Sequence, residues 1–132
     1  MSVYQEKYCV PEFTYDNYEK ITVEKDGPVY IVSFNDPGNL NAMSYAQMAE
    51  FNEFLIKVRM DHECRVIVLT GEGRAFCAGF NLNDLAMEHP DDMGDVQTMY
   101  YLMQRICSDQ VVYMHRCEQP IIGALKGYAV GG

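Results

Sequence analysis

Two glycine-rich turns in this sequence have the composition of backbone anion-binding sites. The first contains Ala78-Gly79-Phe80, and the second, at the end of the chain, contains Val130-Gly131-Gly132. Each follows an apolar stretch, and glycine lets a backbone N–H point at a ligand with no side chain in the way. Two N–H groups about 3 Å from a thioester oxygen stabilise the negative charge of an enolate. The two turns therefore predict an oxyanion-binding site built from the main chain.

Other interpretations of these turns remain open on the residues alone. A dinucleotide-binding fingerprint would begin at Gly71-Glu72-Gly73, but Phe76 stands where close packing of helix on strand needs a small residue. A serine nucleophile elbow needs the pattern GxSxG, which the sequence lacks. Two tight turns without any ligand would be the better interpretation of either turn alone. Their joint occurrence after two strands favours the oxyanion site.

The other reactive side chains show no catalytic or metal-binding pattern. Cys77 has no obvious partner base, and the histidines are scattered along the sequence at His62, His89 and His115. The five cysteines are an odd number without a CxxC pair, which is typical of reduced thiols in a cytosolic-type compartment. Zinc sites usually show paired ligands at short spacing, so the sequence predicts no metal site.

The segments that would position the two turns alternate between strands and helices. Ser44 with Gln47 three residues later is a capping-box signature, and apolar residues at helical spacing follow it. This alternation indicates an α/β fold with crossover connections, in which ligands lie at the carboxyl ends of the strands. We expect an N-terminal extension over 1–20, strands at 21–25, 29–34, 65–70 and 121–125, helices at about 45–60 and 96–117, and a loop at 85–94.

Composition and charge exclude several classes of function. The 132 residues, 48% of them hydrophobic and 22% charged, are typical of one globular domain. The net charge of −9 argues against nucleic acid and anionic membranes as partners, because their binders usually carry a basic face. No apolar run approaches the roughly 20 residues that span a bilayer, and the first ten residues lack a secretion-signal pattern. We therefore expect a cytoplasmic location.

Three segments, in order, resemble signatures of the enoyl-CoA hydratase/isomerase (crotonase) superfamily. The runs are NDPGNLNAMS at 35–44, GEGRAFCAGFNL at 71–82 and QPIIGALKGYAVGG at 119–132. The resemblance covers 21–132 and implies a spiral of strand-strand-helix units, of which this chain would hold the first half. The expected fold is thus a crotonase-like α/β spiral truncated at its midpoint, with the chain stopping inside a motif.

The resemblance also implies an activity and a set of site residues. Members of the family bind acyl-CoA thioesters, assemble as trimers or pairs of trimers, and hold an enolate oxygen between two backbone N–H groups. By position these donors would be the amides of Phe80 and Gly132. Coenzyme A enters as part of the substrate, so no separate cofactor is implied. The residues that would line the CoA pocket are Leu40, Ala42, Ala78, Gly79, Asn81, Leu82, Asn83 and Gly131.

This sequence departs from the family pattern in its charges. Asn81 replaces the usual aspartate and Asn83 a frequent basic residue, and no Lys or Arg occurs from 75 to 104. Arg74 and Lys126 are then the cations closest to the two turns in sequence. Weak CoA binding, or cations from a neighbouring subunit, is the expectation.

A second departure concerns catalysis. The family's acid–base carboxylates lie after the second signature, beyond the residues given, and Asp84 and Glu88 are expected to be solvated. The expected function is an enoyl-CoA hydratase or isomerase whose 132-residue piece alone is inactive. The alternative is a non-catalytic acyl-CoA-binding or interaction fragment, and NADH binding would test the dinucleotide interpretation.

Overall fold

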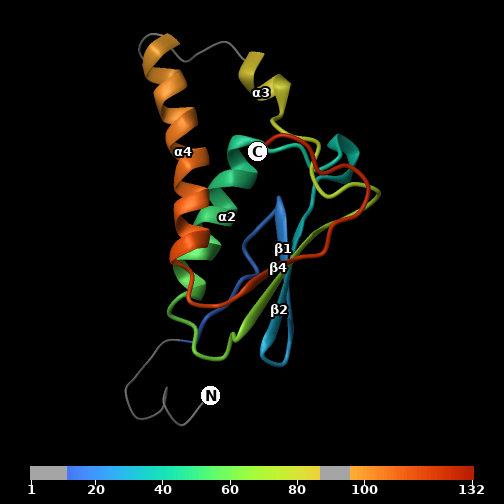
Figure 1. The fold of residues 1–132 in the computed structure, drawn as a ribbon, viewed down its shortest axis with the longest axis vertical. Coiled ribbons are helices and arrows are strands. Elements are labelled where there is room, and N and C mark those ends of the chain that lie inside the picture. The colour runs from blue at the N-terminus through green and yellow to red at the C-terminus, as the bar shows by residue number, and fades with distance from the viewer. Residues whose placement is uncertain (1–11, 87–95) are drawn as a thin grey trace.

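A computed structural model shows two layers, a four-stranded sheet with two helices packed along one of its faces (Figure 1). The structure describes residues 12–86 and 96–132. Its strands are β1 (Ile21–Asp26), β2 (Val29–Phe34), β3 (Val66–Gly71) and β4 (Ile121–Gly123). Its helices are the short 3-10 helix η1 (Pro37–Asn39), α2 (Tyr45–Val58), α3 (Leu82–Ala86) and α4 (Val96–Arg116).

The sheet has the order β1-β2-β3-β4, with β1 antiparallel to β2 and the other pairs parallel. Gly27, at φ 58°, makes the turn between β1 and β2, where a left-handed backbone favours glycine. Helix α2 connects β2 to β3, and α4 precedes β4. The carboxyl ends of β2, β3 and β4 therefore meet at one edge of the sheet, as the predicted crossovers require.

The core lies between the sheet and helices α2 and α4. Apolar side chains of alternate residues in β2 and β3, including Tyr30, Val32 and Ile67, are buried against α2. Phe51 of α2 packs edge-on against Phe34 of β2, with ring centroids 5.5 Å apart. This burial is the main force that holds the helix on the sheet, because burying an aromatic or aliphatic side chain stabilises by about 1.5–3 kcal/mol.

Helix α2 begins where the capping signature predicts. The Ser44 hydroxyl accepts a hydrogen bond from the Gln47 N–H at 3.1 Å. This bond satisfies one of the N–H groups that a helix start leaves without a partner. The predicted apolar stripe of α2 is confirmed, because its members at 48, 51, 55 and 58 are all buried.

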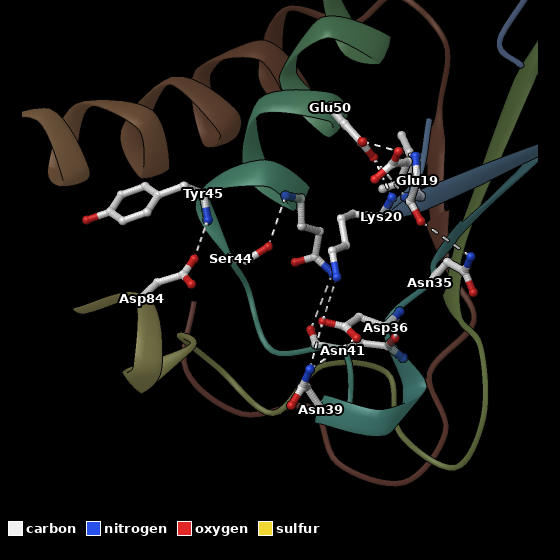
Figure 2. A network of polar contacts seen from close by, with 12 residues as sticks. Glu19, Lys20, Asn35, Asp36, Asn39, Asn41, Ser44, Tyr45, Glu50 and Asp84 are labelled. Atoms are coloured by element: carbon white, nitrogen blue, oxygen red, sulfur yellow. Dashed lines mark hydrogen bonds and ion pairs between the residues drawn. The ribbon is translucent and has the colours of Figure 1, made fainter. Parts of the chain in front are cut away.

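The segment 12–20 packs on the core of its own chain. The Tyr15 hydroxyl donates to Asp61 Oδ2 at 2.8 Å, and the Tyr30 hydroxyl donates to the same oxygen at 2.9 Å. The Glu50 carboxylate accepts the backbone N–H groups of residues 19, 20 and 21 at 2.7–3.1 Å (Figure 2). The described part of the predicted extension is therefore tied to α2 and β1.

Several predicted element ends differ from the structure by one or two residues, and two of these differences lie near the turns. Residues 85 and 86, predicted as part of a loop over 85–94, belong to helix α3. The strand predicted over 121–125 ends at Gly123, although the Ala124 N–H still donates to the Leu69 carbonyl at 2.8 Å. The rest of the predicted loop, and residues 1–11 of the predicted extension, lie outside the described residues.

No helix within 12–86 and 96–132 combines the length and the apolar character that crossing a membrane requires.

Candidate functional site

The two glycine-rich turns lie side by side at the carboxyl edge of the sheet. Cys77 of the first turn forms a parallel bridge with Ala129 of the second. The Cys77 N–H donates to the Tyr128 carbonyl at 2.9 Å, and the Val130 N–H donates to the Cys77 carbonyl at 3.0 Å. The structure thus brings together the two turns that the sequence singled out.

Glycine is required where the turns touch. Gly79 has φ 98° and Gly131 has φ 71°, a region that side-chain-bearing residues rarely adopt. A β-carbon on Gly79 would lie 3.2 Å from the Val130 carbonyl oxygen, and one on Gly131 would lie 3.1 Å from the Gly79 α-carbon. Both the conformation and the close backbone approach therefore depend on the missing side chains.

A third segment, residues 40–43, pairs with the first turn on its other side. The Ala78 N–H donates to the Leu40 carbonyl at 3.1 Å. The Met43 N–H donates to the Gly79 carbonyl at 2.7 Å, and Met43 accepts from the Asn81 N–H at 2.9 Å. Two of these bonds flank Phe80, one to the Gly79 carbonyl and one from the Asn81 N–H, and they form the parallel bridge between Met43 and Phe80.

The backbone N–H groups of Phe80 and Gly132 have no hydrogen-bond partner among the described residues. Both residues contact Met43, which is buried. A β-carbon on Gly132 would lie 2.5 Å from Met43 Cε and 3.6 Å from Phe80 Cζ. The C-terminal residue accordingly lies near the start of α2 (Figure 1). Two residues that adjoin Met43 therefore each carry a backbone N–H without a partner among the described residues.

The other predicted pocket residues differ in their burial. Gly79 is buried, while Leu40, Ala42, Ala78 and Asn81 are half-buried. Leu82 and Asn83 are exposed on α3, and the Asn83 N–H donates to the Asn81 side chain at 3.0 Å. Gly131 is exposed at the surface of the second turn.

Two cavities lined by described residues lie away from the two turns. One, of about 300 Å³, is lined by residues that include Arg59 and Arg65. The other, of about 450 Å³, is lined by residues that include Met114 and Pro120. None of the predicted site residues belongs to either of them.

Two residues near the site have roles that the sequence did not reveal. Asp84 was expected to be solvated, but its Oδ2 accepts the backbone N–H of Tyr45 at 2.9 Å and so fastens α3 to the start of α2 (Figure 2). Asn41 is completely buried and bonds through its side chain to three backbone groups, one from Asp36 and two from the loop after β3. No local period marks such long-range bonds.

The thiol of Cys77 lies inside the first turn and accepts the Gly79 N–H at 3.4 Å. Burial is the largest influence on this thiol and raises its pKa, although hydrogen bonding lowers it in part. The thiol therefore stays protonated at neutral pH, which does not suit a nucleophile. No cluster of His, Cys, Asp and Glu within the described residues could hold a metal ion.

Comparison with known proteins gives matches within one family of enzymes. The sequence model of the enoyl-CoA hydratase/isomerase family matches residues 24–132. The mouse mitochondrial Delta(3,5)-Delta(2,4)-dienoyl-CoA isomerase is 34% identical over 131 residues, covering 96% of this chain and 40% of that protein. A probable peroxisomal enoyl-CoA hydratase 1 from Arabidopsis thaliana is 32% identical over 111 residues, covering 83% of this chain and 38% of that protein.

Solved structures give the same result for the fold. An enoyl-CoA hydratase from Mycobacterium smegmatis superposes with a TM-score of 0.71 at 26% identity, covering 81% of this chain and 40% of that one. Pseudomonas aeruginosa AtuE superposes with a TM-score of 0.73 at 27% identity, covering 83% and 41%. The α/β fold predicted from the sequence is therefore confirmed as that of these proteins. The chain spans about 40% of the length of the relatives it matches.

Proposed function

Because this chain belongs to the enoyl-CoA hydratase/isomerase family, we propose that its two glycine-rich turns bind an acyl-CoA thioester and stabilise the enolate form of that thioester. The donors in this proposal are the backbone N–H groups of Phe80 and Gly132. The observation that carries it is that both groups lack a partner among the described residues and both residues contact Met43. A single donor of this kind lowers the barrier by about 3 kcal/mol in related chemistry.

Coenzyme A would lie along the first turn and the segment 40–43. We assign its contacts to Leu40, Ala42, Ala78, Gly79, Asn81, Leu82, Asn83 and Gly131. The bound group is part of the substrate, so the proposal includes no separate cofactor and no metal. The chain's net charge of −9 argues against nucleic acid or an anionic membrane as a partner.

Arg74 and Lys126 would hold the CoA phosphates. Both are exposed, and the Phe76 N–H donates to the Lys126 carbonyl at 2.8 Å, so the two cations stand on adjoining loops. Exposed charge pairs are screened by salt. CoA affinity should therefore fall steeply with added salt in the wild type and only shallowly in an Arg74→Ala/Lys126→Ala variant. An affinity independent of salt excludes this clamp.

The parent reaction would be hydration of an enoyl-CoA or isomerisation of its double bond. The relatives' names, dienoyl-CoA isomerase and enoyl-CoA hydratase, support this reaction class. The full-length protein would assemble as a trimer or a pair of trimers. A cytoplasmic location remains part of the proposal, although the names of two relatives are mitochondrial and peroxisomal.

Measurements of ligand binding and of turnover test the oxyanion site and the catalytic activity separately. Titration of the 132-residue chain with crotonyl-CoA and with free CoA should show tighter binding of the thioester, because only the thioester reaches the two N–H donors. Equal affinities for the thioester and for free CoA would refute the proposed oxyanion site. Crotonyl-CoA hydration by this chain should stay at the uncatalysed rate. General acid–base catalysis needs a carboxyl or imidazole within hydrogen-bond reach, and the family's acid–base carboxylates lie beyond the residues given.

A second candidate is a non-catalytic acyl-CoA-binding fragment. The observation that favours it concerns Asp84, the carboxylate nearest to the first turn in sequence. Asp84 accepts the Tyr45 N–H, so this carboxylate holds a helix start and is not free to act as a general acid or base. Thioester binding without turnover by the intact protein, of verified mass and at its natural length, would support this candidate. Turnover by a longer parent chain would support the enzyme.

A further inference from the structure

Asn41 connects the loop after β2 to the loop after β3. Its side-chain Oδ1 accepts the Asp36 N–H at 2.8 Å, and its Nδ2 donates to the carbonyls of Glu72 at 2.9 Å and Ala75 at 2.8 Å. Figure 2 shows Asn41 beside Asp36, below the start of α2. Both N–H bonds of the carboxamide are used, in a residue with no exposed surface. The side chain therefore acts as a brace between two loops.

The bonds of the Asn41 side chain depend on the space beside Gly71 and on the backbone conformation of Asn41. Asn41 has φ 55°, a left-handed value that asparagine tolerates better than most residues. A β-carbon on Gly71 would lie 2.8 Å from Asn41 Nδ2 and 2.7 Å from the Ala75 carbonyl oxygen. Gly71 thus leaves the space in which the carboxamide reaches its acceptors.

The segment that follows the brace sets the place of the Phe80 amide. Leu40 and Met43, on either side of Asn41, pair with the backbone of residues 78, 79 and 81. Phe80 lies between these bonds, and its own N–H donates to no described backbone group. Any shift of 40–43 would therefore move the direction in which this N–H points.

We propose that Asn41 is a positioning residue that aims the Phe80 N–H through the backbone of residues 40–43. It acts on the donor through the backbone and not on the substrate. The inference rests on the proposed function for its catalytic meaning, but the brace itself is measurable without any ligand.

The test compares Asn41→Gly with Asn39→Ala. Glycine keeps the left-handed conformation at no steric cost and removes only the carboxamide. Asn39 lies in the same loop and is exposed, and its Nδ2 donates to the Asp36 carboxylate at 3.1 Å. Its replacement therefore controls for a lost side-chain bond in this loop.

Hydrogen exchange of single amides tests the brace directly. In Asn41→Gly the amides of Ala78 and Asn81 should exchange at least about tenfold faster than in wild type, because their acceptors lie on the released segment. The Cys77 amide, bonded to Tyr128, should keep its protection. The Asn39→Ala variant should match wild type at all three amides. Equal acceleration at all three in Asn41→Gly would mean general destabilisation and overturn the inference.

Ligand binding then tests the effect on the donor. Binding to two fixed N–H groups should red-shift the absorbance of a conjugated dienoyl-CoA, because the donors polarise its carbonyl. Asn41→Gly should lose most of this shift and at least about tenfold of the thioester's advantage over free CoA, as expected for one misaligned donor. A wild-type chain without the shift would refute the proposed function. A full shift in Asn41→Gly would refute the role of Asn41 alone.

Discussion

Gly79 and Gly131 touch through their backbones, since a β-carbon on Gly131 would lie 3.1 Å from the Gly79 α-carbon. Both residues have positive φ angles, 98° and 71°. The two turns come from segments about fifty residues apart, and side chains at these positions would push them apart. The proposed pair of donors depends on this contact, because Phe80 and Gly132 each follow one of the two glycines.

Replacing Gly79 with alanine should destabilise the chain and separate the turns. The new β-carbon would meet the Val130 carbonyl oxygen at 3.2 Å, in a left-handed conformation that alanine adopts at a cost of about 1–3 kcal/mol. Chemical denaturation measures this loss. Gly38→Ala is the control, because Gly38 has open space around it and no positive φ. A change below about 0.5 kcal/mol in Gly79→Ala would contradict the packing of the two turns.

The amide of Gly132 is tested by comparing alanine with proline at that position. Either residue places a β-carbon against the flexible end of Met43, but only proline removes the N–H. Gly132→Pro should lower the preference for a thioester over free CoA by about tenfold or more relative to Gly132→Ala. Calorimetric titration of both variants gives the ratio. Equal preference in the two variants would exclude the Gly132 N–H as a donor.

The sequence was sufficient to predict the parts of this fold that repeat locally. The cap at Ser44 follows from Ser44 and Gln47 three residues apart, and the apolar stripe of α2 follows from a period of 3.6 residues. The strands before the two turns follow from short, nearly continuous apolar runs. The five residues of α3 are too few for any such period. The whole chain's membership in the family rested on three ordered motifs, and the family comparison confirms it.

Bonds between side chains and distant backbone groups escaped prediction. The Asn41 carboxamide reaches carbonyls 31 and 34 residues away, and Asp84 accepts from an N–H 39 residues away. Neither residue differs in type or spacing from an ordinary loop residue. Only the approach of the loops in space decides that one is buried and that the other caps a helix.

The buried Tyr15–Asp61–Tyr30 cluster should make stability depend on alkaline pH. Burial, followed by the hydrogen bond to Asp61 and its charge, raises the pKa of both tyrosines above the ordinary value of about 10. The folded state then keeps protons that the unfolded state loses above pH 10. Each tyrosine therefore contributes stability that is complete below pH 10 and falls by up to about 1.4 kcal/mol per pH unit above it.

Urea denaturation at pH 8, 10 and 11 measures this dependence. The double variant Tyr15→Phe/Tyr30→Phe should be less stable at pH 8 by about 1–3 kcal/mol, because Asp61 loses two donors. Its stability should also decline less steeply above pH 10. Tyr128→Phe is the control, since Tyr128 is 58% exposed. A double variant with the slope of wild type would show that these hydroxyls do not cause the alkaline loss.

The described cysteines should differ in reactivity according to their burial. Burial is the main cause that raises the pKa of Cys64 to about 12 and also raises the pKa of Cys77, and both side chains are at most 5% exposed. Because the thiolate is the reactive form, iodoacetamide at pH 8 should label Cys64 and Cys77 more slowly than the half-buried Cys107 and Cys117. Peptide mass spectrometry after timed quenching gives each rate. Labelling in about 8 M urea, which unfolds most small domains, is the control in which the four rates should converge. Fast labelling of Cys77 in the folded chain would mean that the first turn opens, and would contradict the close pairing of Cys77 with Tyr128 and Val130.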